Sequence, residues 1–130
     1  MELNDELTSR IEAAVLDVFS TYDFHRATTR EIAASAKTSL SKLYAFGSTK
    51  DEVFFHFVSR WIAQLASLTE EAAMQTQSGA KERLQAAIRA EFAFYDRDPR
   101  LARALFLTLP RGVWIRDQSF NAPGVRQLDR

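Results

Sequence analysis

Residues 28–44 read TTREIAASAKTSLSKLY, and this stretch decides the fold of the chain. Thr28 can cap the start of a short helix, and Glu31, three residues later, can bond back to the same turn and complete a capping box. The pattern indicates that this helix ends near Ala36. After a turn, Ser39 is a typical N-cap for a second short helix. The stretch therefore predicts two short helices joined by a tight turn, which is a helix-turn-helix.

On both sides of this stretch, apolar residues recur at the three- and four-residue steps of amphipathic helices. One helix is expected before it, over about residues 5–21. The second short helix should run over 40–45 and stop before Gly47. Later helices are expected over about residues 50–75, 81–95 and 99–109. Because no segment shows strand-like alternation, the predicted fold class is all-α.

The composition is typical of a soluble globular protein. Of the 130 residues, 46% are hydrophobic and 26% are charged, and cysteine is absent, which excludes disulfides and thiolate metal sites. No apolar run approaches the roughly eighteen residues that cross a bilayer, and the acidic first residues are unlike a signal peptide. We therefore expect a cytoplasmic protein that does not insert into a membrane.

No set of residues suggests catalysis, a metal or a cofactor. The two histidines, His25 and His56, lie far apart without carboxylates at a metal-ligand spacing. Nucleophile elbows and glycine-rich phosphate loops are absent from the sequence, and the acidic pairs are typical of solvated helix faces. The sequence therefore predicts no enzyme, no metal and no cofactor.

Charge is unevenly distributed, although seventeen basic and seventeen acidic residues cancel over the whole chain. Residues 26–50 contain five basic residues and one acid, a local charge of +4. Residues 1–23 contain six acids and Arg10, a local charge of −5. A basic patch is what binding to a phosphate backbone requires. Helical hairpins of this size also occur in all-α proteins that bind no DNA.

The sequence between Ile11 and Val53 resembles the N-terminal domain of the TetR family of transcription regulators. The residues that carry the resemblance are Phe19, Thr28, Thr29, Arg30, Glu31, Ile32, Ala33, Ala36, Ser39, Leu43, Tyr44 and Lys50. The chain departs from the family's pattern in the turn, where Lys37 and Thr38 replace a glycine and an apolar residue, and at Ser41. Lys37 then requires a left-handed backbone or an altered turn.

The resemblance implies a three-helix DNA-binding domain over residues 1–48 and part of a helical effector-binding and dimerisation domain over residues 49–130. The second short helix would enter the major groove of double-stranded operator DNA. Hydroxyls, amines and the start of the fourth helix suit phosphate oxygens, whereas lysine and leucine can also contact base edges. The DNA-binding residues expected on this basis are Thr28, Thr29, Arg30, Thr38, Ser39, Leu40, Ser41, Lys42, Tyr44 and Lys50.

The resemblance further implies a repressor that binds a near-palindromic operator as a homodimer and is released by a small apolar effector. The residues expected to line the effector pocket, which are equally suited to a core, are Trp61, Leu65, Phe92, Tyr95, Phe106 and Trp114. The family's dimer interface uses further C-terminal helices. We therefore expect the chain to be a shortened form with apolar surface exposed on its later helices.

A second interpretation comes from another class of protein. The chain could be a helical small-molecule-binding or protein-interaction module whose helix-turn-helix no longer binds DNA. Lys37, Ser41, Gly47 and the zero net charge favour this alternative. Salt-dependent DNA binding distinguishes the two interpretations, because only phosphate contacts make affinity fall steeply with salt.

Overall fold

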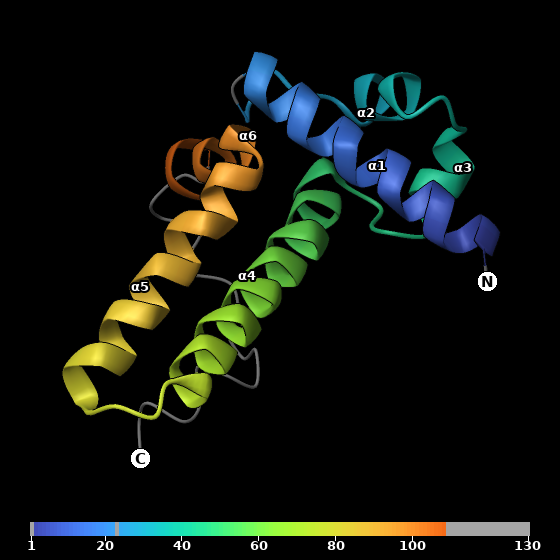
Figure 1. Ribbon diagram of the computed structural model, residues 1–130. Coiled ribbons are helices and arrows are strands. Elements are labelled where there is room, and N and C mark those ends of the chain that lie inside the picture. Colours follow the sequence, from blue (N-terminus) through green and yellow to red (C-terminus); the bar gives the residue numbers. More distant parts are fainter. Residues whose placement is uncertain (1, 23, 109–130) are drawn as a thin grey trace.

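The chain folds into helices without strands in the part that the computed structural model describes, residues 2–22 and 24–108 (Figure 1). This architecture confirms the all-α fold class. The elements are α1 (Glu2–Thr21), α2 (Thr29–Ser35), α3 (Leu40–Leu43), α4 (Lys50–Gln75), α5 (Ala80–Arg97), α6 (Pro99–Arg103) and the π-helical segment η1 (Ala104–Thr108).

Side-chain caps begin the helices where the sequence predicts them. Thr28 Oγ1 accepts from the Glu31 N–H at 3.2 Å, and the Glu31 carboxylate accepts from the Thr28 N–H at 3.1 Å, which completes the capping box. Ser39 Oγ accepts from the Lys42 N–H at 3.2 Å. Asp98 accepts from the Arg100 N–H at 3.0 Å, with Pro99 in the first turn of α6. Local sequence thus determines these helix starts.

Two helices differ near their ends from what the sequence predicts. The third helix was expected to reach residue 45, but α3 ends at Leu43. The Phe46 N–H donates to Leu43 O at 2.9 Å, an i+3 bond that tightens the last turn. The Phe46 ring stacks on Phe57 of α4 at 5.7 Å, so this turn directs the chain to α4. Similarly, α6 ends at Arg103 and widens into η1, and the expected end at residue 109 lies outside the described residues.

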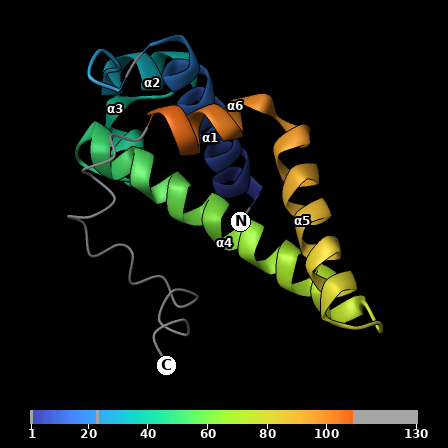
Figure 2. The ribbon, with the colours of Figure 1, turned by 90° about the vertical axis from the view of Figure 1, so that its left-hand side faces the viewer.

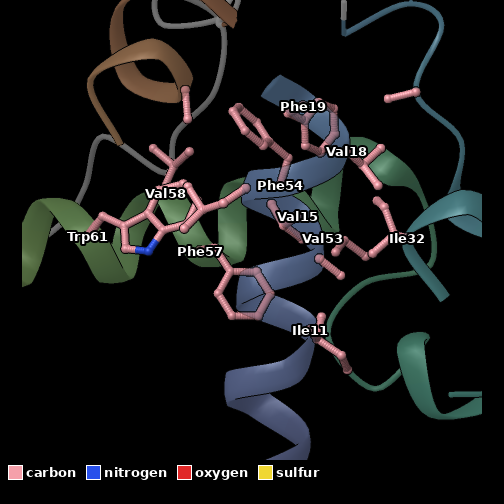
Figure 3. Packing of buried hydrophobic residues seen from close by; sticks show 14 of the residues in the cluster. Ile11, Val15, Val18, Phe19, Ile32, Val53, Phe54, Phe57, Val58 and Trp61 are labelled. Carbon is pink, nitrogen blue, oxygen red and sulfur yellow. The ribbon is translucent and has the colours of Figure 1, made fainter. Parts of the chain in front are cut away.

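One buried cluster joins the helix-turn-helix to the first half of α4 (Figure 3). One close aromatic contact crosses from α1 to α4, where the Phe19 and Phe54 ring centroids lie 4.5 Å apart. Ile32 and Leu43 bring α2 and α3 to the same cluster. The predicted domain boundary at residues 48 and 49 therefore runs beside a shared core, and α4 cannot tilt without disturbing the packing of α1.

Beyond this core, α4 and α5 form an antiparallel hairpin that extends away from α1, α2 and α3 (Figure 2). The hairpin and η1 expose apolar side chains, as the sequence analysis expected for the later helices. The exposed fractions run from 37% to 76%, and the residues are Leu68, Met74, Leu84, Ile88, Phe92 and Phe106. None of the helices among residues 2–22 and 24–108 combines the length and the apolarity that crossing a membrane requires.

Candidate nucleic-acid interface

The turn between α2 and α3 is a regular helix end with an unusual residue in it. The Thr38 N–H donates to Ala33 O at 3.0 Å, and the Lys37 N–H donates to Ala34 O at 3.1 Å. These two bonds form a Schellman motif, whose left-handed position glycine usually occupies. Here Lys37 occupies it with φ of 53°. Of the two possibilities expected for this residue, a left-handed backbone or an altered turn, the structure has the left-handed backbone.

Arg10 of α1 holds this turn in place. Its Nε donates to Ala36 O at 3.1 Å and its Nη2 donates to Lys37 O at 3.3 Å. Because a guanidinium makes stronger hydrogen bonds than a neutral donor, these contacts fix the end of α2 against α1. Sequence reasoning did not find this role for Arg10. The one hint in the sequence was that Arg10 is the single basic residue in the acidic segment 1–23.

The short helix α3 presents a polar surface around a buried anchor. Leu43 is 0% exposed and attaches the helix to the core. Helical geometry places Ser41 nearly opposite Leu43, with Lys42 and Tyr44 on the two flanks. All three of these side chains are exposed, Tyr44 by 48%. This arrangement leaves hydroxyl, amine and phenol groups free to meet a partner.

The structure brings nine of the ten predicted DNA-binding residues together on α2, α3 and the turn between them. The exposed ones are Thr28, Arg30, Ser39, Ser41, Lys42 and Tyr44. The half-buried ones are Thr29, Thr38 and Leu40, and Leu40 packs partly against the core. The tenth, Lys50, lies at the start of α4.

The Lys50 amine is directed toward the loop that precedes α2. Its Nζ donates to Phe24 O at 2.7 Å and to His25 O at 3.0 Å, both in the loop between α1 and α2. The same nitrogen lies 5.1 Å from the centroid of the Phe24 ring. The side chain that the sequence analysis assigned to a phosphate is thus bonded to the protein's own backbone.

The start of α4 is capped internally and is negatively charged. Thr49 Oγ1 accepts from the Glu52 N–H at 3.2 Å. Ser48 donates from both its hydroxyl and its N–H to the Glu52 carboxylate, each at 2.7 Å. These bonds, led by the hydroxyl of Ser48, hold the pKa of Glu52 below its ordinary value. With Asp51 beside it, the ionised carboxylate disfavours a phosphate at this helix end.

Comparison with known proteins finds two regulators that the chain is similar to. The chain is 31% identical over 102 residues to the HTH-type transcriptional activator FasR of Mycolicibacterium smegmatis, a match that covers 78% of this chain and 46% of the relative. Its fold matches that of the fatty acid degradation regulator FadR from Bacillus halodurans, with a TM-score of 0.76, 16% identity, and coverage of 92% of this chain and 63% of that one. The likeness in sequence to one regulator and in fold to another supports the resemblance to TetR-type regulators. No protein-family model matches it.

Both likenesses support the resemblance found between Ile11 and Val53. The chain spans less than half of the FasR sequence and less than two thirds of the FadR chain. Both matched proteins are named as regulators of transcription or metabolism, in agreement with the prediction that the chain is not an enzyme.

The predicted effector residues lie in different settings. Trp61 is buried, and its Nε1 donates to the Glu12 carboxylate of α1 at 2.7 Å. Leu65 is half-buried, whereas Phe92 is 66% exposed. Tyr95 is half-buried, and its ring centroid lies 5.5 Å from that of the exposed Phe106. Trp114 lies outside the described residues. A shared role in binding an effector remains a prediction.

An open cleft of about 640 Å³ lies where the end of α1 meets α6 and η1. Phe106 is the one predicted effector residue in its lining, which also includes Ser20, Pro99, Arg100, Ala102 and Arg103. Arg100 is already paired with Asp98 at 2.7 Å. The cleft therefore does not bring the predicted effector residues together.

Thr38 supplies a first testable prediction. Its Oγ1 is buried and has no hydrogen-bond partner among the described residues, so it does not face outward as a base contact would. A buried hydroxyl without a partner costs about 1–3 kcal/mol. We expect Thr38→Val to raise the free energy of unfolding by about 1 kcal/mol in urea denaturation. Operator affinity should not change.

Thr38→Ser is the matched control because it keeps the hydroxyl and removes only the methyl group. It should not be more stable than the native chain. A loss of stability in Thr38→Val would show that the hydroxyl has a partner, such as a bound water, and a loss of operator affinity alone would restore its predicted contact with a base.

Proposed function

We propose that this chain binds operator DNA through α2 and α3 and that a small apolar effector weakens the binding. The observation that carries the proposal is the exposed set Ser41, Lys42 and Tyr44 around the buried Leu43. A helix anchored from below and polar on its outer surface is suited to the major groove. The local charge of +4 over residues 26–50 supplies attraction to phosphates.

The contacts divide into two kinds. Thr28, Thr29 and Tyr44 would hold phosphates and set the register of the protein on the duplex. Ser41 and Lys42 would meet base edges, where an amine can donate to guanine O6 or N7. The fixed turn at Lys37 matters for both kinds, because it sets the angle between α2 and α3.

A homodimer would place two copies of α3 in successive major grooves, about 34–36 Å apart on a near-palindromic operator. An effector bound among α4, α5 and α6 would alter this spacing through α4, whose first half shares a core with α1. Because FadR is named for fatty acid degradation, we propose an acyl compound as the effector class. FasR is named an activator, so the proposal covers activation as well as the repression expected from the sequence.

Fluorescence anisotropy tests the proposal, with labelled DNA from the chain's own upstream region titrated at several salt concentrations. We expect saturable binding whose affinity falls steeply with salt. Lys42→Met should weaken operator binding about tenfold or more, since a good base contact is worth about 1–3 kcal/mol. Lys81→Met, a matched loss of charge on α5, should leave the affinity unchanged.

A folded, dimeric sample that binds no DNA even at low salt would overturn this function. That result would favour the alternative, a small-molecule-binding or protein-interaction module. Equal losses in Lys42→Met and Lys81→Met would show that net charge alone, and not the surface of α3, attracts DNA.

A further inference from the structure

Lys50 joins two parts of the chain that are distant in sequence. It is the first residue of α4, and its amine bonds two carbonyls of the loop that precedes α2. The Thr49 cap and the bonds between Ser48 and Glu52 hold the same end of α4. Lys50 therefore moves with α4 as a body.

The other end of this link is equally well anchored. The Phe24 ring lies under the amine and stacks on Phe19 at a centroid distance of 5.6 Å. It also meets Phe54 of α4 edge-on at 5.6 Å. Ala27, three residues after Phe24, is 1% exposed. The loop thus has little freedom to absorb a displacement of its carbonyls.

The loop leads directly into the helix-turn-helix. Thr28, the N-cap of α2, follows Ala27, and its carbonyl accepts the Ile32 N–H at 3.2 Å. A shift of the Phe24 and His25 carbonyls therefore passes within a few residues to the first turn of α2. At the other end of α2, the turn at Lys37 passes the same shift to α3.

From these contacts we propose that Lys50 is a positioning residue. It ties the start of α4 to the loop before α2 and so makes the orientation of α2 and α3 follow α4. A positioning Lys50 does not bind phosphate, because an amine extended toward DNA would lose its hydrogen bonds to the Phe24 and His25 carbonyls. This inference rests on the proposed function and identifies the residue through which the DNA-binding surface is regulated.

The salt dependence of operator affinity separates the two roles of Lys50. A lysine that binds phosphate contributes about 0.9 to the slope of log affinity against log salt concentration. We expect Lys50→Met to weaken operator binding about tenfold, the factor for one lost charge-assisted hydrogen bond, without changing this slope. Arg30→Met, which removes an exposed charge from α2, provides the comparison for a reduced slope.

Amide hydrogen exchange tests the link between Lys50 and the loop before α2 in the absence of DNA. In Lys50→Met we expect the Ile32 amide, in the first turn of α2, to exchange about tenfold faster, because the loop before it loses its tie to α4. Amides in the middle of α5 should be unaffected. Measurements are made well below the melting temperature of the variant, so that loss of the whole fold does not contribute.

The two measurements together decide the inference. Weaker binding with an unchanged slope and faster exchange at Ile32 supports a positioning role. A slope reduced by about 0.9 with unchanged exchange overturns it in favour of a phosphate contact. Unchanged affinity and unchanged exchange also overturn it. If the native chain binds no DNA, the proposed function fails, and the exchange experiment still tests the link.

Discussion

Replacing Phe54 with alanine should destabilise the fold by about 3–5 kcal/mol, which is a large part of the stability of a small domain. Phe54 is 0% exposed, and its ring lies 4.5 Å from Phe19 and 5.6 Å from Phe24. The substitution removes both the buried apolar area and the ring contacts, and it leaves a cavity where α1 meets α4. Urea denaturation followed by circular dichroism measures the loss.

Phe92→Ala is the matched control, because it makes the same chemical change on a ring that is 66% exposed. Its effect on the free energy of unfolding should stay within about 0.5 kcal/mol. A similar loss in both variants would mean that the apolar surface of α5 is covered in solution. A loss below about 1.5 kcal/mol in Phe54→Ala would contradict the tightly packed core described for this cluster.

The helix starts could be predicted from the sequence because each cap is a local interaction. Thr28 and Glu31 are three residues apart, and so are Ser39 and Lys42, whose N–H donates to the Ser39 hydroxyl. The left-handed backbone at Lys37 was one of two possibilities expected there, because the resemblance places this residue where the family usually has glycine. Family resemblance then added the expected DNA-binding surface.

The direction of the long basic side chains could not be predicted, because it depends on contacts between distant segments. The Lys50 amine meets carbonyls more than twenty residues earlier in the chain, and Arg10 meets carbonyls as far ahead of it. A sequence pattern shows that such a residue begins a helix or lies on one. It does not show whether the charge faces solvent, a phosphate or the backbone.

The face of α5 that packs inward was also hidden from the sequence. Leu84, Ile88 and Phe92 follow one side of the helix and are exposed, while Phe94 lies nearly opposite Phe92 and is 1% exposed. Both sides carry apolar residues, so periodicity alone does not choose between them. The neighbouring helices make the choice, which is why the predicted effector residue Phe92 lies on the surface.

Gly47→Ala should have the second largest effect, because a methyl group has no room at the junction of α3 and α4. A Cβ at this position would lie 2.6 Å from Glu52 Cβ and 2.6 Å from the Val53 nitrogen. These are atoms of the first turn of α4, and Val53 is 0% exposed, so the helix cannot retreat without opening the core. We expect a loss of about 1–3 kcal/mol in thermal or urea denaturation.

The same substitution should weaken operator binding more than the lost stability explains, because relief of the clash displaces α3 from α4. Gly79→Ala provides the control, since its Cβ would meet only the flexible Glu82 carboxylate, at 3.5 Å. There the conformational entropy lost by the unfolded chain stabilises the fold and offsets a poorer N-cap, so the change should stay within about 0.5 kcal/mol. If both alanine variants are equally stable and bind DNA equally well, the junction of α3 and α4 is not a rigid link. The recognition surface would then be free to move independently of α4, and regulation through α4 would need another route.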